Sequence, residues 1–173
     1  MRVAWIGLAF TLAALPASAQ TGNEALCMNP DRDIKIAGCT AVIRSGQELP
    51  AGLAIAYSNR GSAYADKGLY DKAIADLTKA IALAPNSPEA YNGRAWAYHL
   101  KGQDAKGLPD VEKSIALAPG NADSTETRAE INEMLGRRDA AIADYRQTLK
   151  LASPGSEAVR DAESGLKRLG ARP

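Results

Sequence analysis

Apolar and polar positions along the chain recur with a 34-residue period. Gly68 aligns in this way with Gly102 and Gly136. The stretch Ile81–Pro85 recurs unchanged at 115–119 and in altered form at 149–153. A constant period of this length is typical of repeat proteins, in which each unit packs against its neighbours. A generic helical bundle would not show it.

Each unit has the pattern of two short helices joined by a turn. In the first unit Tyr57, Gly61 and Tyr64 are four and three residues apart, which places them on one face of a helix. Gly68 ends this helix, because glycine readily adopts the left-handed conformation that follows many helices. The second helix has its own apolar face, made by Ala73, Ile74, Leu77, Ala80 and Ile81. The pattern therefore predicts an all-α chain of helical hairpins.

The repeated positions resemble the tetratricopeptide-repeat (TPR) family. The matching residues are Tyr57, Gly61, Tyr64, Ala73, Leu77, Ala80, Pro85, Ala95, Tyr98, Val111, Pro119, Ala129, Ala141 and Tyr145. The resemblance covers residues 54–153. It implies a TPR solenoid with about three full 34-residue units, at 54–87, 88–121 and 122–153.

The segment before these units, residues 20–53, is predicted to hold a degenerate leading half repeat. Ile36–Ile43 resembles Ile74–Ile81, the second helix of the first unit, and Cys39 stands at one of its packing positions. The first helix of this half repeat is expected to be missing. We expect the segment around Cys27 to take its place.

The segment after the units, residues 154–173, is predicted to form a capping helix. Val159, Leu166 and Leu169 would cover the last unit, while the intervening charged residues face water. An open solenoid needs such a polar end for solubility.

The second unit departs from its neighbours at Gly107 and Pro109. Pro109 falls where Ala75 lies inside the second helix of the first unit. Proline inside a helix lacks the amide donor and clashes with the preceding turn, at a cost of about 3 kcal/mol. We therefore expect this helix to start late, with Pro109 in its first turn. Neutral drift and a functional hinge are both open as the reason for the departure.

The amino terminus has the pattern of an export signal over residues 1–19. Arg2 supplies a positive charge, Val3–Leu15 is almost entirely apolar, and Ala17-Ser18-Ala19 offers small residues for cleavage. The alternative is a membrane anchor, but this apolar run is shorter than the roughly 20 residues that span a bilayer. We expect an exported protein, periplasmic or secreted, without an integral membrane segment after cleavage.

The two cysteines that remain after cleavage, Cys27 and Cys39, are predicted to form a disulfide. An even pair in an exported chain is typical of disulfides. The alternatives are weaker, because a metal site would need further ligands and the spacing of a CxxC redox motif is absent.

Charge and chemistry exclude several functional classes. The chain has 21 Lys and Arg against 20 Asp and Glu, and loss of Arg2 with the signal leaves 20 of each. Nucleic-acid binding would need a basic excess. His99 is the only histidine, and no nucleophile, metal-ligand or phosphate-binding motif is present. We expect no enzyme activity, no cofactor and no metal site.

Three arginines also recur with the 34-residue period, each on the first helix of its unit. Each has an aspartate candidate on a second helix, since the aspartates recur with the same period. We predict a ladder of ion pairs that ties the hairpins together. The residues are Arg60, Arg94 and Arg128 with Asp76, Asp110 and Asp144.

The TPR resemblance implies a concave groove lined by the first helices, where a partner would bind. The candidate partner-binding residues are Ser58, Ser62, Asn92, Trp96, His99, Leu100, Glu126, Glu130 and Glu133, with Ala65, Asp123 and Met134 on the same face. Trp96 is either an anchor for the partner or covered by the neighbouring hairpin. The run Glu126, Glu130 and Glu133 is either a solvated face or a selector of basic segments.

Some TPR domains hold the C-terminal carboxylate of a chaperone with Lys, Asn and Arg. Here the corresponding positions hold Ser58, Ser62, Gly93, Asp123 and Thr127, so no cation is available. We expect instead an adaptor that holds an extended protein or peptide segment, with basic character where it meets the acidic unit. The alternative is a structural module that self-associates in envelope assembly, and the oligomeric state is open.

Overall fold

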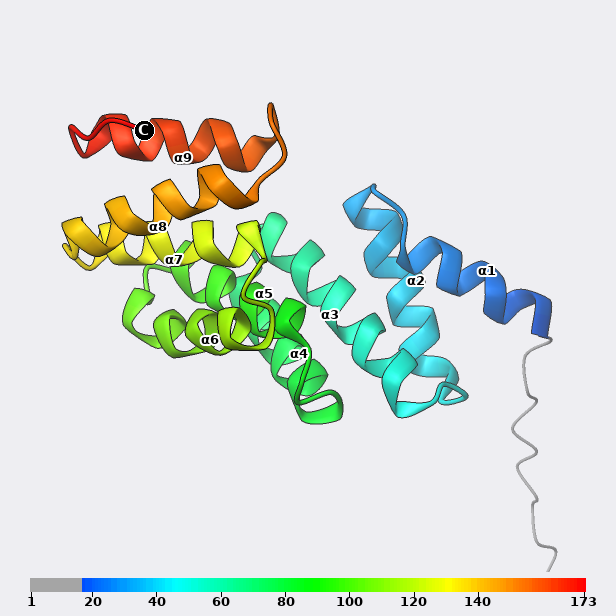
Figure 1. Cartoon of the computed structure of the whole chain (residues 1–173). Coiled ribbons are helices and arrows are strands. Elements are labelled where there is room, and N and C mark those ends of the chain that lie inside the picture. The colour runs from blue at the N-terminus through cyan, green and yellow to red at the C-terminus, as the bar shows by residue number, and fades with distance from the viewer. Residues whose placement is uncertain (1–16) are drawn as a thin grey trace, which may run out of the picture.

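The structure is a computed structural model that describes residues 17–173, with side chains described from Gly22 onward. Within this range the chain forms nine helices and no strand, so the all-α prediction is confirmed (Figure 1). The helices are α1 (Ala17–Cys27), α2 (Arg32–Ser45), α3 (Pro50–Asp66), α4 (Tyr70–Leu83), α5 (Pro88–Leu100), α6 (Asp104–Leu117), α7 (Ala122–Met134), α8 (Arg138–Leu151) and α9 (Glu157–Arg168). The predicted signal peptide lies outside the described residues except for its last three positions, with which α1 begins. Among the described helices, none is both long and apolar enough to cross a membrane.

Consecutive helices pair into hairpins, and the hairpins stack into a solenoid (Figure 1). The backbones of the first helices α3, α5, α7 and α9 approach one another in sequence, whereas those of α4, α6 and α8 lie farther apart. The array is therefore closed on the side of the first helices and open on the side of the second helices. This places the first helices on the concave face.

Repeated capping residues set the helix ends. The side-chain oxygens of Ser87, Asn121 and Ser156 accept hydrogen bonds from backbone amides in the first turns of α5, α7 and α9. At the opposite ends of these helices, and of α3, a glycine at the equivalent repeat position adopts a left-handed conformation, with φ between 63° and 73°. Gly170 completes this series after α9, so α9 keeps the register of a first helix.

The core is built from one large residue facing small ones in each hairpin. Leu77, Val111 and Tyr145 occupy equivalent positions in the three units, and all are fully buried. Leu77 packs against Gly61 so closely that a Cβ atom at position 61 would lie 2.7 Å from Leu77 Cγ. Such contacts bring the paired helices together and explain why small residues recur in the first helices.

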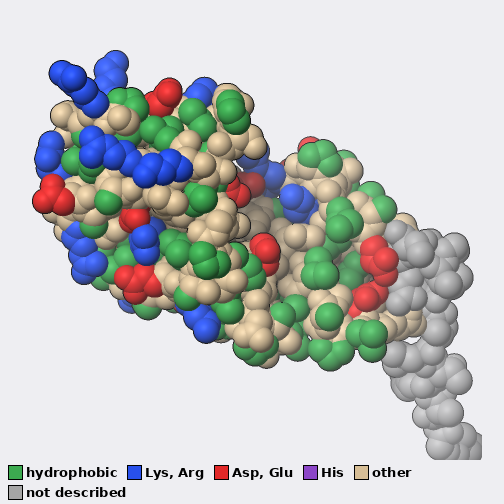
Figure 2. Space-filling view, in the orientation of Figure 1, with side chains coloured by type: hydrophobic (Ala, Val, Ile, Leu, Met, Phe, Trp, Pro, Cys, Tyr) green, Lys and Arg blue, Asp and Glu red, His purple; other side chains and the backbone are tan. Residues whose placement is uncertain are grey.

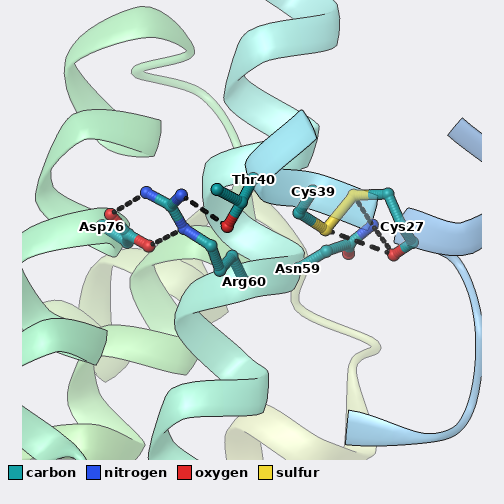
Figure 3. Close-up of a disulfide and its surroundings, with 6 residues drawn as sticks. All are labelled: Cys27, Cys39, Thr40, Asn59, Arg60 and Asp76. Carbon is teal, nitrogen blue, oxygen red and sulfur yellow. Dashed lines mark hydrogen bonds and ion pairs between the residues drawn. A yellow bond between two sulfur atoms is a disulfide. The ribbon is translucent and has the colours of Figure 1, made fainter. Parts of the chain in front are cut away.

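The predicted ladder of ion pairs is confirmed. In each unit the arginine makes a two-pronged contact with the aspartate, and the shortest N–O distances are 2.6–2.7 Å. Arg60 also donates to Thr40 of α2, so one side chain joins three helices (Figure 3). Arg94 repeats this arrangement with Thr78. The ladder therefore links each hairpin internally and, in two of the units, to its predecessor.

The leading segment differs from its predicted form. The segment around Cys27 takes the place of the first helix, as expected, but it is itself the helix α1, which pairs with α2 as a full hairpin and not as a half repeat. The disulfide between Cys27 and Cys39 joins these two helices, and Asn59 of α3 donates to the carbonyl of Cys27 (Figure 3). A Cβ atom at Gly38 would lie 2.6 Å from the backbone of α1. These contacts hold α1 against α2 and α3.

The first regular unit has a longer first helix than expected. Helix α3 begins at Pro50, about one turn before the predicted boundary at residue 54, and Pro50 and Pro88 are both first residues of their helices. The extra turn explains why the shift that aligns Ile36–Ile43 with Ile74–Ile81 is longer than the repeat period by about one helical turn.

The prediction of a late start for α6 was wrong. The helix begins at Asp104 and continues through Pro109. Pro109 is exposed, whereas Asp110 and Val111 beside it are buried in the ion pair with Arg94 and in the core. These contacts hold the helix on its inner face, so the cost of one proline on the outer face is tolerated.

Candidate functional site

The concave face carries a hollow of about 380 Å³ between α5, α7 and α9. Each of the three helices contributes residues to it, from positions that recur along the solenoid. The lining residues are Asn92, Trp96, Asp123, Glu126, Thr127, Glu130, Glu157, Ala158 and Asp161. The structure thus brings together four predicted candidates, Asn92, Trp96, Glu126 and Glu130, with Asp123 from the same predicted face.

Five of the lining side chains are carboxylates, and none of them has an ion pair with a basic residue in the described part of the chain. Burial, followed by repulsion from Glu130, Asp161 and other acids, raises the pKa of Glu126 to about 7. Burial also raises the pKa of Glu130. The hollow therefore holds negative charge at some energetic cost to the fold.

Helix α9 contributes Glu157 and Asp161, two residues of the segment that was predicted only to form a cap. Both residues stand one repeat length after groove residues, Asp123 and Thr127. The repeat register would have identified them if it had been extended past residue 153. Helix α9 covers the last hairpin and also supplies one wall of the hollow.

Trp96 both packs against neighbouring helices and faces the groove, the two environments predicted for it as alternatives. It is partly buried against the cluster that contains Leu77 and Ala97, and it also lines the acidic hollow. Its ring stacks on His99 with 5.2 Å between centroids. His99 is fixed in turn by a 2.6 Å contact between Nδ1 and Asp104. Trp96 is thus a rigid aromatic wall of the hollow.

Glu133 and Leu100 are placed away from the hollow. Glu133 accepts from Arg168 of α9 and from the hydroxyl of Tyr145. The bond from Arg168 is the main reason why the pKa of Glu133 is lowered. Leu100 packs with Trp96 on the cluster around Leu77. Both side chains hold elements together in this structure.

The other end of the concave face is neutral. Ser62 is exposed, and Ser58 lines a second hollow of about 330 Å³, between α3, α4 and α5, in which alanines predominate. The only charged residue there is Glu89. The concave face therefore changes from neutral at the first unit to acidic at the third unit and α9.

Basic side chains lie elsewhere. On the face that Figure 2 shows, Lys and Arg gather over α8 and α9. In the described residues no group of three or more acidic, histidine or cysteine side chains is arranged to hold a metal ion.

Comparisons with known proteins identify the repeat. A family model described as TPR repeat matches residues 61–102. No curated protein matches the chain in sequence. The Arabidopsis OM64 TPR domain has a similar structure, with a TM-score of 0.64 and 25% identity over 70% of this chain and 97% of that domain.

Two further solved structures extend the comparison. The first TPR of Spaghetti (RPAP3), bound to the HSP90 peptide SRMEEVD, has a TM-score of 0.62 and 25% identity, over 70% of this chain and 96% of that one. TTC0263, a TPR protein of Thermus thermophilus, has a TM-score of 0.68 over 88% of this chain and 80% of its own. At 19% identity this last match is evidence of the fold alone.

Proposed function

Because the chain is a tetratricopeptide-repeat protein, we propose that it is a non-catalytic scaffold that binds an extended, basic segment of another protein in its concave groove. The observation that carries the proposal is the acidic hollow, which Trp96 lines together with five carboxylates that have no ion pair in the described part of the chain. Lys and Arg side chains are the natural partners of such a surface, since each offers a cation for the carboxylates and a stem or plane for the tryptophan.

The contrast with the peptide-bound relative supports a basic ligand. The Spaghetti domain holds an HSP90 peptide that ends in Glu-Glu-Val-Asp, an acidic sequence. The groove of this chain has Asp123 and Glu126 on α7 and two more carboxylates on α9. Like charges in a groove of this kind would repel an acidic peptide. The same fold is therefore expected to select the opposite charge here.

We also propose that the protein acts after export, in the periplasm or outside the cell. Two features support this location. Residues 1–19 have the pattern of a cleavable signal, and the disulfide between Cys27 and Cys39 suits an oxidising compartment.

Tryptophan fluorescence provides a direct test of peptide binding. The chain has two tryptophans, Trp5 and Trp96, so a Trp5→Phe variant reports on the groove alone. A lysine-rich peptide should change the emission of Trp96 with saturation. The same peptide with glutamate in place of lysine should not bind.

The variant Glu126→Gln with Glu130→Gln should bind the lysine-rich peptide about tenfold or more weakly, because hydrogen bonds to charged groups contribute roughly 1.5–3 kcal/mol each. A matched control is Glu112→Gln with Glu163→Gln, since these exposed carboxylates line none of the hollows. The control should keep the affinity of the parent. Equal binding of the lysine and glutamate peptides would refute the proposal.

A further inference from the structure

A third hollow, of about 250 Å³, lies at the amino-terminal end of the solenoid, between α1, α2 and α3. Its walls are mainly apolar and include the disulfide residue Cys27, Val42 and Ala56. Two large apolar side chains at its mouth are open to solvent, Met28 at 72% and Ile55 at 56% exposure. An exposed apolar surface around a preformed hollow is typical of a site where a partner inserts a side chain.

The apolar hollow belongs to the same row of repeat positions as the acidic one. Ile55 is two repeat lengths before Asp123 and three before Glu157. Asn59 is related in the same way to Thr127 and Asp161. Ile55 and Asn59 line the apolar hollow, and their equivalents on α7 and α9 line the acidic hollow. Ile55 and Asn59 also line the neutral hollow between α3, α4 and α5. A single extended segment that follows the groove would therefore meet both ends.

The rim of the apolar hollow carries acidic side chains as well. Glu24 of α1 and Glu48, before α3, both line it. Glu48 raises the pKa of Glu24, first through a side-chain hydrogen bond and then through charge repulsion. Gly52 leaves room for this arrangement, because a Cβ atom there would lie 2.5 Å from a carboxylate oxygen of Glu48. Negative charge at the rim favours a basic residue beside the inserted apolar one.

We propose that the amino-terminal hollow is a second docking point for the same partner, which inserts a bulky apolar side chain there while its basic residues occupy the acidic hollow. This inference rests on the proposed function of the groove. The expected partner is then a basic segment that also carries one apolar anchor residue, at a fixed distance from its basic residues.

The spacing follows from the geometry of the array. Helix α3 packs on α5, and α5 packs on α7. Packed helices are about 8–10 Å apart, so α3 and α7 are separated by roughly 16–20 Å. An extended chain covers about 3.3 Å per residue. The apolar anchor and the basic residues should therefore be about six residues apart.

Labelled peptides of fixed composition test this spacing with the full chain in fluorescence anisotropy. One set carries lysines with a leucine at the expected spacing, in either chain direction. A second set replaces the leucine by serine, and a third moves it next to the lysines. In at least one direction the spaced leucine should bind about tenfold or more tighter than serine, as expected for burial of one large apolar side chain. The adjacent leucine should bring little gain.

The variant Met28→Gln with Ile55→Gln should remove the gain from leucine and leave the affinity for the serine peptide unchanged. The matched control is Leu69→Gln with Leu83→Gln, since both of these side chains are exposed and line neither hollow. Circular dichroism would establish that each variant is folded. If unfolding affects the first variant, Ile55→Gln alone provides the test, because the equivalent positions in later units hold acidic residues.

The two proposals fail in different ways. If the serine peptide does not bind at all, the acidic groove itself is refuted. If it binds but the leucine gives no gain at any spacing, only the second docking point is refuted. A gain that persists in the Met28 and Ile55 variant would place the anchor elsewhere and would also overturn the inference.

Discussion

The leading hairpin and the three regular units solve the same problem by different means. Both must hold a first helix against a second helix at close range. The regular units use a two-pronged ion pair from arginine to aspartate. The leading hairpin has no such pair between α1 and α2 among its described residues and uses the disulfide between Cys27 and Cys39. At the position of the ladder aspartate it has Gly38, which lets the helices touch.

The type of link corresponds to the number of neighbouring hairpins that each hairpin contacts. A regular unit contacts a hairpin on both sides, whereas α1 and α2 have a neighbour on one side only among the described residues. A covalent link suits an end unit, because it restricts the unfolded chain and does not depend on a second neighbour. The ion pairs suit inner units, because burial between hairpins strengthens them.

Of the changes that test this comparison, removing the disulfide should reduce the stability of the chain most. Cys27→Ser with Cys39→Ser should lower the free energy of unfolding by about 3 kcal/mol, as the loop-entropy relation gives for a closed loop of this size. Chemical denaturation measures the loss, and hydrogen exchange should accelerate in α1 while α7 to α9 stay protected. Reduction of the wild-type chain should reproduce the loss. A uniform acceleration across all helices would show that the leading hairpin is not a separate unit of stability.

Breaking one ion pair of the ladder should have a slightly smaller effect. Arg94→Ala leaves Asp110 buried without its partner and should cost about 2–3 kcal/mol, somewhat below the range for fully buried pairs since Arg94 is 20% exposed. Arg94→Lys keeps the charge but loses the fork, and should cost about 1 kcal/mol. Urea denaturation distinguishes the two. Unchanged stability of Arg94→Ala would mean that the ladder does not stabilise the units.

The smallest expected effect is a dependence of stability on pH, which arises from Glu126 in the acidic hollow. The pKa of Glu126 is about 7 in the folded chain, above the value of about 4.3 for an unfolded glutamate. The folded state therefore binds the proton more tightly, and the stabilisation present at low pH is lost as the pH rises through 7. Allowing for solvent screening of this half-buried group, stability should fall by about 1 kcal/mol from pH 5 to pH 8.

The variant Glu126→Gln isolates this contribution. Its free energy of unfolding should fall less between pH 5 and pH 8 than that of the wild-type chain, and the Glu163→Gln control should keep the wild-type slope. Equal slopes in all three proteins would show that Glu126 does not titrate in this range.

The sequence alone determined the features that repeat or that depend on neighbours along the chain. The 34-residue period predicted the hairpins, because glycine turns and apolar faces act locally on helix ends. It also predicted the arginine–aspartate ladder, because side chains in equivalent positions of stacked units meet equivalent partners. Much of the candidate site followed from the resemblance to the TPR family, which implies a groove lined by the first helices and so assigned Trp96, Glu126 and Glu130 to it.

Only the tertiary structure decided features that depend on how one element meets another. Helix α1 pairs with α2 as a full hairpin where the sequence predicted a half repeat, and the disulfide and the close approach at Gly38 hold the two helices together. Helix α6 continues through Pro109 because the contacts of its buried face outweigh the local penalty. Glu133 is bound by Arg168 from a helix 35 residues away in sequence, and no local pattern gives that contact. The apolar hollow at one end of the groove and the acidic wall from α9 at the other exist only once the helices are stacked.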